Sequence, residues 1–166
     1  ITFTKTGNIP NVHLYYNAGA GDTAIVSDFA GTSTTWTVPA GALGSSVTLK
    51  VKDSDATHVL TETSSTAFNV KGTITVTEPT ALLTVGTAEN LVWTKTSTIT
   101  SVDIEYSTTG GGGPWTLIVA GKTGTSHSWS PPDGAIGTSV TVRVKDANAA
   151  NPTTQDDTNP FQVQGV

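Results

Sequence analysis

Apolar and polar residues alternate along much of the chain, as they do in strands that have one buried face. In SVTVRVKD, residues 139–146, valine occupies every second position from Val140 to Val144, and the polar residues between are predicted to face solvent. The segment SVDIEY, residues 101–106, alternates in the same way. No window keeps the three-to-four-residue apolar spacing of an amphipathic helix. The pattern therefore predicts an all-β protein.

The alternating segments occur twice. LVWTKTSTITSVDIEY at 91–106 repeats ITFTKTGNIPNVHLYY at 1–16, and WSPPDGAIGTSVTVRVKD at 129–146 matches WTVPAGALGSSVTLKVKD at 36–53 in eleven of eighteen positions. The repeat distance is 90 residues before the loop TTGGGGP and 93 after it. A period of this length fits a complete immunoglobulin-sized sandwich and is too long for one solenoid unit.

The sequence predicts two tandem Ig-like antiparallel β-sandwiches, residues 1–72 and residues 73–166, the first lacking its N-terminal strand. In the second repeat the first strand is split at Pro79, because proline cannot donate to a sheet. The predicted strand segments are 73–79, 81–86, 90–96, 101–107, 115–120, 127–131, 139–146 and 160–164. The predicted aromatic core is Trp93, Tyr106, Trp129 and Phe161, with Phe3, Tyr16, Trp36 and Phe68 as counterparts.

The first repeat has no equivalent of residues 73–90, because Ile1 aligns with Leu91. In the second repeat this segment is expected to bury four apolar side chains: Ile74, Val76, Leu82 and Val85. At about 1.5–3 kcal/mol for each buried side chain, their loss is comparable to the stability of a whole domain.

The first repeat is therefore expected to have an open sheet edge that accepts a partner strand. This strand-acceptor edge is predicted at Ile1, Phe3 and Lys5. Three explanations stay open: the sequence is a window of a longer array, a neighbouring subunit supplies the strand by β-augmentation, or the family tolerates a truncated domain.

Composition narrows the functional class. Charged residues make up 13% of the chain and the net charge is −5, which argues against nucleic acid or an anionic membrane as the partner. No segment resembles a membrane span. Cysteine is absent, so disulfides and thiolate metal sites are excluded. Together with the bias towards threonine, glycine, alanine and serine, this composition predicts an extracellular, cell-surface protein.

No catalytic arrangement stands out. The three histidines lie in unrelated contexts, and the G-x-S-x-G motif of serine hydrolases is absent. The GGGG run at 110–113 is followed by Pro114 and Trp115, not by the lysine and helix of a phosphate-binding loop. The chain is therefore predicted not to be an enzyme and to need no cofactor.

Two kinds of binding residue are candidates. Trp115, at a loop margin, and Tyr15, on an outer strand face, are candidate contacts for a sugar ring, with edge packing as the alternative for Trp115. Carboxylates follow equivalent strands in both repeats, at Asp53, Asp55, Asp146, Asp156 and Asp157. Oxygen-rich loops of this kind bind Ca²⁺, but aspartate also starts turns for local reasons, and neither loop has the EF-hand register.

The ordered pattern of Trp93–Thr94, the alternation from Val102 to Tyr106, Trp129 with Pro132, and Val142–Asp146 before Phe161 carries a resemblance. It resembles the Ig-like module of the Ser/Thr-rich anchored cell-wall protein family, which includes the N-terminal region of the yeast β-1,6-glucan synthesis proteins. Similar modules recur in large microbial surface proteins. The resemblance covers residues 73–165, and residues 1–72 without the first strand. It implies a spacer or surface building block with no catalytic residues.

The sequence thus predicts a structural tandem-repeat module of an extracellular surface protein or filament, such as a stalk, sheath or surface layer. Its expected partners are neighbouring copies or modules of the same protein. The alternative is a carbohydrate-binding adhesin or an enzyme accessory module that contacts a cell-surface glycan.

Overall fold

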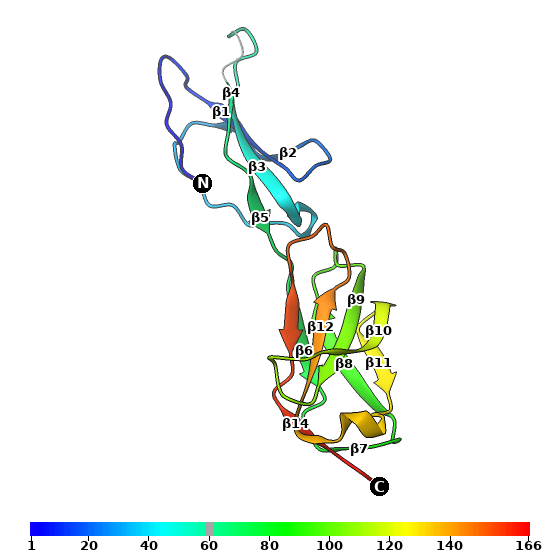
Figure 1. The fold of residues 1–166 in the computed structure, drawn as a ribbon. Coiled ribbons are helices and arrows are strands. Elements are labelled where there is room, and N and C mark those ends of the chain that lie inside the picture. The colour runs from blue at the N-terminus through cyan, green and yellow to red at the C-terminus, as the bar shows by residue number, and fades with distance from the viewer. Residues whose placement is uncertain (59–61) are drawn as a thin grey trace. The chain divides into compact units, whose positions relative to one another are not determined.

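The computed structural model describes residues 1–58 and 62–166. The chain divides into two compact units, Ile1–Lys71 and Gly72–Val166, called the first and the second unit below (Figure 1).

The second unit is a sandwich of two sheets. One sheet has the order β10-β9-β12-β14-β7, with β13 beside β12, and the other has the order β11-β8-β6. Its strands are β6 (Ile74–Glu78), β7 (Leu83–Thr84), β8 (Glu89–Lys95), β9 (Ser101–Ser107), β10 (Thr116–Thr123), β11 (Ser126–Trp129), β12 (Gly137–Asp146), β13 (Gln155–Asp157) and β14 (Phe161–Gln164). A short 3-10 helix, η2 (Asp133–Ala135), leads into β12. All pairs are antiparallel except β7 with β14.

The first strand of the second unit is split between the two sheets, as predicted. β6 pairs with β8 in one sheet, and β7 pairs with β14 in the other. Pro79, directly after β6, is buried at the crossover. Because proline has no N–H to donate, it interrupts the ladder at the point where the chain changes sheets.

The core of the second unit is dense. The buried apolar residues are Ile74, Leu83, Leu91, Trp93, Ile99, Val102, Ile104, Tyr106, Trp129, Ala135, Val140, Val142, Val144, Phe161 and Val163. They include all four predicted core aromatics, and the rings of Tyr106 and Trp129 lie 5.4 Å apart.

Two burial predictions for the second unit are wrong, and two more are met only in part, because Val76 and Val85 are half-buried. Leu82 is 51% exposed and Leu83 is buried in its place, because β7 pairs with β14 through Leu83 and Val163. Thr141 was expected to face solvent but is 1% exposed, since β12 lies inside its sheet with strands on both sides. No hydrogen-bond partner is found for its hydroxyl among the described residues.

The first unit keeps one sheet of the sandwich apart from the equivalent of β7, with the order β2-β1-β3-β4 and β5 also paired to β3. Its elements are β1 (Val12–Asn17), β2 (Asp22–Phe29), η1 (Ala40–Ala42), β3 (Gly44–Asp53), β4 (Glu62–Ser64) and β5 (Phe68–Val70). The second sheet is represented by a bridge between Thr2 and Ser33, which is equivalent to the pairing of Val92 with Ser126 in the second unit. The prediction of Ig-like sandwiches, the first without its N-terminal strand, is confirmed.

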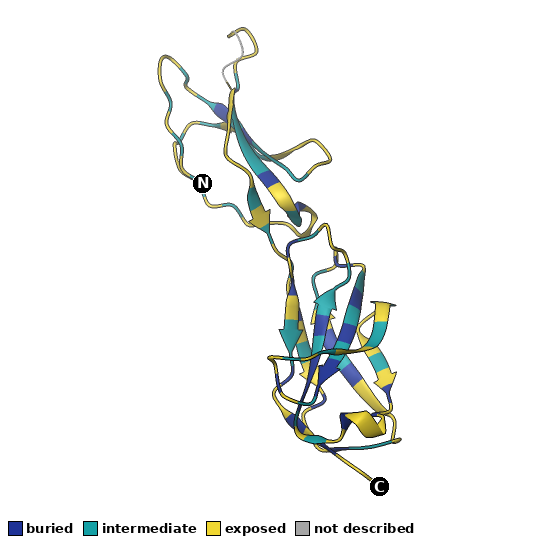
Figure 2. Cartoon of the chain, viewed as in Figure 1, coloured by how far each residue is buried: buried dark blue, intermediate teal, exposed yellow. Residues whose placement is uncertain are grey.

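The core of the first unit is much smaller. Its buried apolar residues are Val12, Leu14, Ala42 and Val47. The counterparts of the buried aromatics, Phe3, Tyr16, Trp36 and Phe68, are all only half-buried. Figure 2 shows the same contrast, with few dark-blue residues in the first unit and many along the strands of the second.

Candidate functional site

The loop after β3 folds around the carboxylate of Asp53. Its Oδ1 accepts the backbone N–H of Asp55 at 3.0 Å, and its Oδ2 lies 2.7 Å from Nδ1 of His58. Asp55 in turn accepts the N–H and the hydroxyl of Thr57, at 2.9 and 2.7 Å. The Asp53 side chain is 3% exposed. Both predicted acidic residues therefore organise this loop.

The electrostatics of this loop favour an ion pair. Hydrogen bonds from the Asp55 amide and from His58 lower the pKa of Asp53, and the hydrogen bonds from Thr57 lower the pKa of Asp55. The hydrogen bond to Asp53 and the charge of Asp55 raise the pKa of His58 above its ordinary value. The imidazolium and the two carboxylates hold one another in their charged forms.

The equivalent loop of the second unit folds around Asp146. Its Oδ1 accepts the N–H of Asn148 at 2.9 Å, and its Oδ2 accepts the side-chain amide of Asn151 at 2.8 Å. The Asn148 side chain accepts the N–H of Ala150 at 3.1 Å. Asp146 is thus occupied by local donors, as expected of an aspartate that starts a turn.

Asp156 and Asp157 lie on β13 and bind other partners. Asp156 Oδ2 accepts the backbone N–H of Val76 at 2.8 Å. Asp157 accepts Nε and one terminal nitrogen of Arg143 at 2.7 and 2.8 Å. Because Asp156 and Asp157 bind Val76 and Arg143 instead, the two do not form the predicted cation-binding group with Asp146. Over residues 1–58 and 62–166, no cluster of three or more acidic or histidine side chains could hold a metal ion.

Trp115 packs against Arg143. The guanidinium carbon lies 3.8 Å from the centre of the indole ring, and the other end of the guanidinium binds Asp157. Arg143 also donates to the carbonyl of Gly111 at 3.2 Å. One face of the half-buried indole is therefore occupied by a cation, and the glycine loop is fixed to β12.

Tyr15 lies on the outer face of the first unit. In the sheet it is paired with Ala24 of β2 and Lys50 of β3, and its ring meets His13 edge-on with centroids 6.2 Å apart. Lys50 binds Asp22 at 2.7 Å. Tyr15 and Trp115 belong to different units, so neither unit gathers the two predicted sugar contacts on one face.

The strand-acceptor edge is predicted one residue out of place, because alternate residues of the segment face the open side. The backbone groups of Ile1 and the N–H of Phe3 are bonded to residues 32–34, with Ile1 N to Thr34 O at 2.8 Å and Phe3 N to Thr32 O at 3.0 Å. Since adjacent residues of a strand point their backbone groups to opposite sides, the side away from Ser33 belongs to Thr4 and Thr6. The Lys5 ammonium donates to the carbonyls of Pro10 and Ala30.

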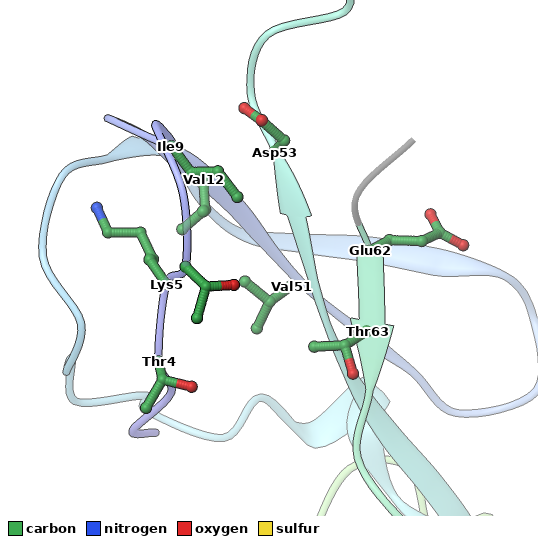
Figure 3. A pocket seen from close by; sticks show the side chains of 9 residues that line it. Thr4, Lys5, Ile9, Val12, Val51, Asp53, Glu62 and Thr63 are labelled. Atoms are coloured by element: carbon green, nitrogen blue, oxygen red, sulfur yellow. The ribbon is translucent and has the colours of Figure 1, made fainter. Parts of the chain in front are cut away.

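A cavity of about 190 Å³ lies beside this segment. Its lining residues are Thr4, Lys5, Thr6, Ile9, Val12, Val51, Asp53, Glu62 and Thr63. In Figure 3 the segment with Thr4 and Lys5 runs along one side, with Val51 of β3 and Thr63 of β4 on the other. The cavity is therefore bounded by backbone on two sides and has valine at its base.

Sequence reasoning missed two residues that determine the local geometry. The sequence context of His58 alone does not mark it as a partner of Asp53, although its place five residues after Asp53 corresponds to Asn151 after Asp146. For Arg143 the apolar alternation predicts only an outer face. Its position opposite Asp157 depends on β13, and no alternation signal marked that three-residue strand.

Comparison with known proteins does not assign the chain to a family. No family model matches the chain, and no curated protein matches it. Among solved structures, it is similar to the fibronectin(III)-like modules of Clostridium thermocellum CbhA, with 16% identity, TM-score 0.40 and coverage of 98% of this chain and 83% of that one. It is also similar to a structure of Dpr11 IG1 bound to DIP-gamma IG+IG2, with 10% identity, TM-score 0.34 and coverage of 96% and 86%. No helix in the described parts of the chain is long and apolar enough to cross a membrane.

Proposed function

We propose that this chain is a structural repeat module of an extracellular surface protein or filament, of the Ser/Thr-rich anchored cell-wall type, and that it is not an enzyme. Its partners in this proposal are neighbouring modules or copies of the same protein, including one that supplies a strand. Nucleic acid is not a partner in this proposal, because the chain carries a net charge of −5.

One observation carries this proposal: the polar groups that could do chemistry are used to hold loops in place. Asp53 and Asp146 serve equivalent turns, and Asp157 fixes Arg143. A catalytic or ligand-binding carboxylate instead needs oxygens that remain available to a substrate or an ion. Side chains committed to internal contacts suit a module whose task is to keep its shape.

The proposal is tested by locating the parent protein in its own cells. Antibodies raised against residues 73–166 are applied to intact cells before and after mild protease treatment, and bound antibody is imaged with gold particles. We expect labelling on the outer surface that protease removes. Labelling found only after the cells are broken open would contradict the proposal.

A carbohydrate-binding adhesin or enzyme accessory module is the second candidate, favoured by the position of Tyr15 on an outer sheet face beside His13. It predicts that the chain is retained on insoluble cell-wall polysaccharide and that Tyr15→Ala or Trp115→Ala lowers this retention at least about tenfold. The structural role predicts equal, low retention of all three proteins. This measurement separates the two functions.

A further inference from the structure

The second unit shows what fills the position of the first-unit cavity. There the segment from Gly72 to Val76 runs antiparallel to β8, with Thr75 paired to Thr94 and the N–H of Thr96 donated to the carbonyl of Thr73 at 2.9 Å. Gly72 lies so close to Ile99 that a Cβ on it would be 2.8 Å from that side chain.

Several residues that line the cavity occupy positions equivalent to those that surround the first strand in the second unit. Thr4, Ile9, Val12 and Val51 correspond to Thr94, Ile99, Val102 and Val144, and Thr63 corresponds to Asp156. Ile99 and Val144 are fully buried in the second unit, whereas Ile9 and Val51 are only half-buried. The cavity is thus the unfilled counterpart of the strand position.

The backbone on this side is also available. Thr4 and Thr6 are equivalent to Thr94, which is paired with Thr75, and to Thr96, whose N–H is donated to the carbonyl of Thr73. Within the described part of the chain, no hydrogen bond joins the backbone of Thr4 or Thr6 to another segment. Exposed strand edges of this kind accept an added strand through main-chain hydrogen bonds.

We infer that this cavity is a binding site for an extended strand with the chemistry of residues 72–76: a glycine first, then β-branched apolar side chains at alternate positions. The strand lies outside residues 1–166 and runs antiparallel to residues 2–6. The inference rests on the proposed function, because a repeat protein supplies such strands from neighbouring modules.

The lining specifies the strand further. A glycine is favoured where the strand passes Ile9, as Gly72 passes Ile99. The hydroxyl of Thr63 takes the place of the Asp156 carboxylate that accepts the N–H of Val76. Asp53 and Glu62 at the margin disfavour an acidic strand, since they carry like charge.

A second copy of this chain is not the occupant in this inference. The strand with the required sequence, β6, is already paired with β8 in its own unit, and its Val76 amide is bound by Asp156. Donating it would uncover Ile74 and Ile99, both buried, in the donor. The occupant is therefore a strand of this chemistry that is not already paired in a sheet of its own.

The test is a titration of the full 166-residue chain with a fluorescent peptide of residues 72–80, GTITVTEPT, followed by anisotropy. We expect saturable one-to-one binding, with the amides of Thr4 and Thr6 becoming protected from hydrogen exchange. The matched control is the same peptide with Ile74→Asp and Val76→Asp, which leaves length and backbone unchanged. It is expected to bind at least about tenfold more weakly, because one buried and one half-buried apolar side chain are lost.

Two variants sharpen the assignment. A peptide with Gly72→Val is expected to lose at least about tenfold in affinity, since a side chain there meets Ile9. In the chain, Thr63→Asp restores the second-unit acceptor and is expected to tighten binding about threefold. Because the peptide variants act on the unaltered chain, they do not depend on whether a chain variant folds.

Three results would overturn the inference: no binding of the unaltered peptide, equal binding of the double-aspartate peptide, or protection at amides away from residues 2–6. Protection of Thr4 that grows with chain concentration without peptide would assign the cavity to a second copy and also overturn it. The location of the parent protein is measured separately, so peptide binding by an intracellular protein would remove the proposed function and leave this inference standing.

Discussion

The loops that begin at Asp53 and at Asp146 build the same turn with different side chains. In each, the aspartate accepts a backbone N–H two residues on and a side-chain nitrogen five residues on. That nitrogen belongs to His58 in the first unit, at 2.7 Å, and to Asn151 in the second, at 2.8 Å. The turn thus requires a donor at this position and tolerates either a titratable or a neutral one. Only the first-unit loop can respond to pH near neutrality.

The two units also differ in the positively charged residue at equivalent positions of β3 and β12, which is Lys50 in the first unit and Arg143 in the second. Lys50 binds Asp22 at 2.7 Å, whereas the equivalent Arg143 binds Asp157 through two nitrogens and stacks on Trp115. A planar guanidinium can make both contacts at once, and an ammonium cannot. Lys50 also lies 3.9 Å from Glu62, so a cation joins β3 to β2 and to β4 in the first unit as well. What the second unit gains is the stacking of this cation on Trp115, directly before β10.

The largest difference between the two units is expected in the loss of stability caused by a core substitution. Trp93→Ala removes a ring that is 1% exposed and should destabilise the second unit by about 3–5 kcal/mol. The matched change Phe3→Ala, at a half-buried position, should cost the first unit less than about 2 kcal/mol. Urea unfolding followed by tryptophan fluorescence and circular dichroism gives both values. Equal losses would mean that the first unit has a closed core in solution.

A smaller effect on stability is expected for substitutions of Arg143 and Lys50. Arg143→Lys should destabilise the second unit by about 1 kcal/mol, since a lysine cannot keep both the stacking on Trp115 and the paired bonds to Asp157. Lys50→Arg in the first unit serves as the control and should change little, because its partner sites are exposed. Thermal unfolding of the four proteins, including Trp115→Ala, tests this. No loss in Arg143→Lys would show that the stacked arrangement contributes nothing to stability.

A gain is expected from removing an unpartnered hydroxyl. Thr141 is buried and its hydroxyl has no partner among the described residues, so Thr141→Val should stabilise the second unit by about 1 kcal/mol. The equivalent Thr48→Val, at a half-buried position, should be close to neutral. Urea midpoints measure both changes. Destabilisation by Thr141→Val would indicate a bound water at the hydroxyl.

The smallest effect is the pH response of the first-unit loop. Because the pKa of His58 is raised in the folded state, His58 contributes fully to the stability of the loop below its ordinary pKa of 6.5. This contribution is lost as pH rises through the pKa of the folded state. The lowered pKa of Asp53 makes its contribution present above 3.8 and lost as pH falls through its folded value. The loop is therefore expected to be most stable between about pH 4 and 6.5.

The pH response is measured by NMR titration of the His58 ring and by unfolding midpoints of the first unit from pH 4 to 9. His58→Asn copies the second-unit loop and should remove the loss of stability above neutral pH. Asn151→His should introduce the same loss into the second unit. A His58 that titrates at its ordinary pKa would contradict the ion pair.

Much of the fold followed from the sequence because the apolar alternation is strong and occurs twice. The eleven identities between 36–53 and 129–146 located the same strand in both repeats, and Pro79 marked the split first strand correctly. The misassignment of Leu82 arose because β7 has two residues, too few for a period of two to show which one is buried. The burial of Thr141 depends on its place inside the sheet, which composition cannot reveal.

The candidate site was less predictable, because it depends on contacts between distant segments. That acidic residues start turns could be foreseen for Asp53 and Asp146, from their position after a strand. The partners of Asp156 and Asp157 could not, since Val76 lies 80 residues away and Arg143 lies across a ladder that the sequence did not mark. The phase of the open edge was likewise fixed by the bonds of Ile1 to Thr34.

The bond from the Val76 amide to Asp156 has a consequence for the sheet edge that β6 forms. Neighbouring copies of nearly the same strand are natural partners for mispairing, which leads to aggregation when a sheet edge stays open. In the second unit a carboxylate, not another strand, accepts the outward N–H of β6. It adds negative charge where a foreign strand would approach. Asp156 thus lowers the tendency of this sheet edge to pair with a foreign strand.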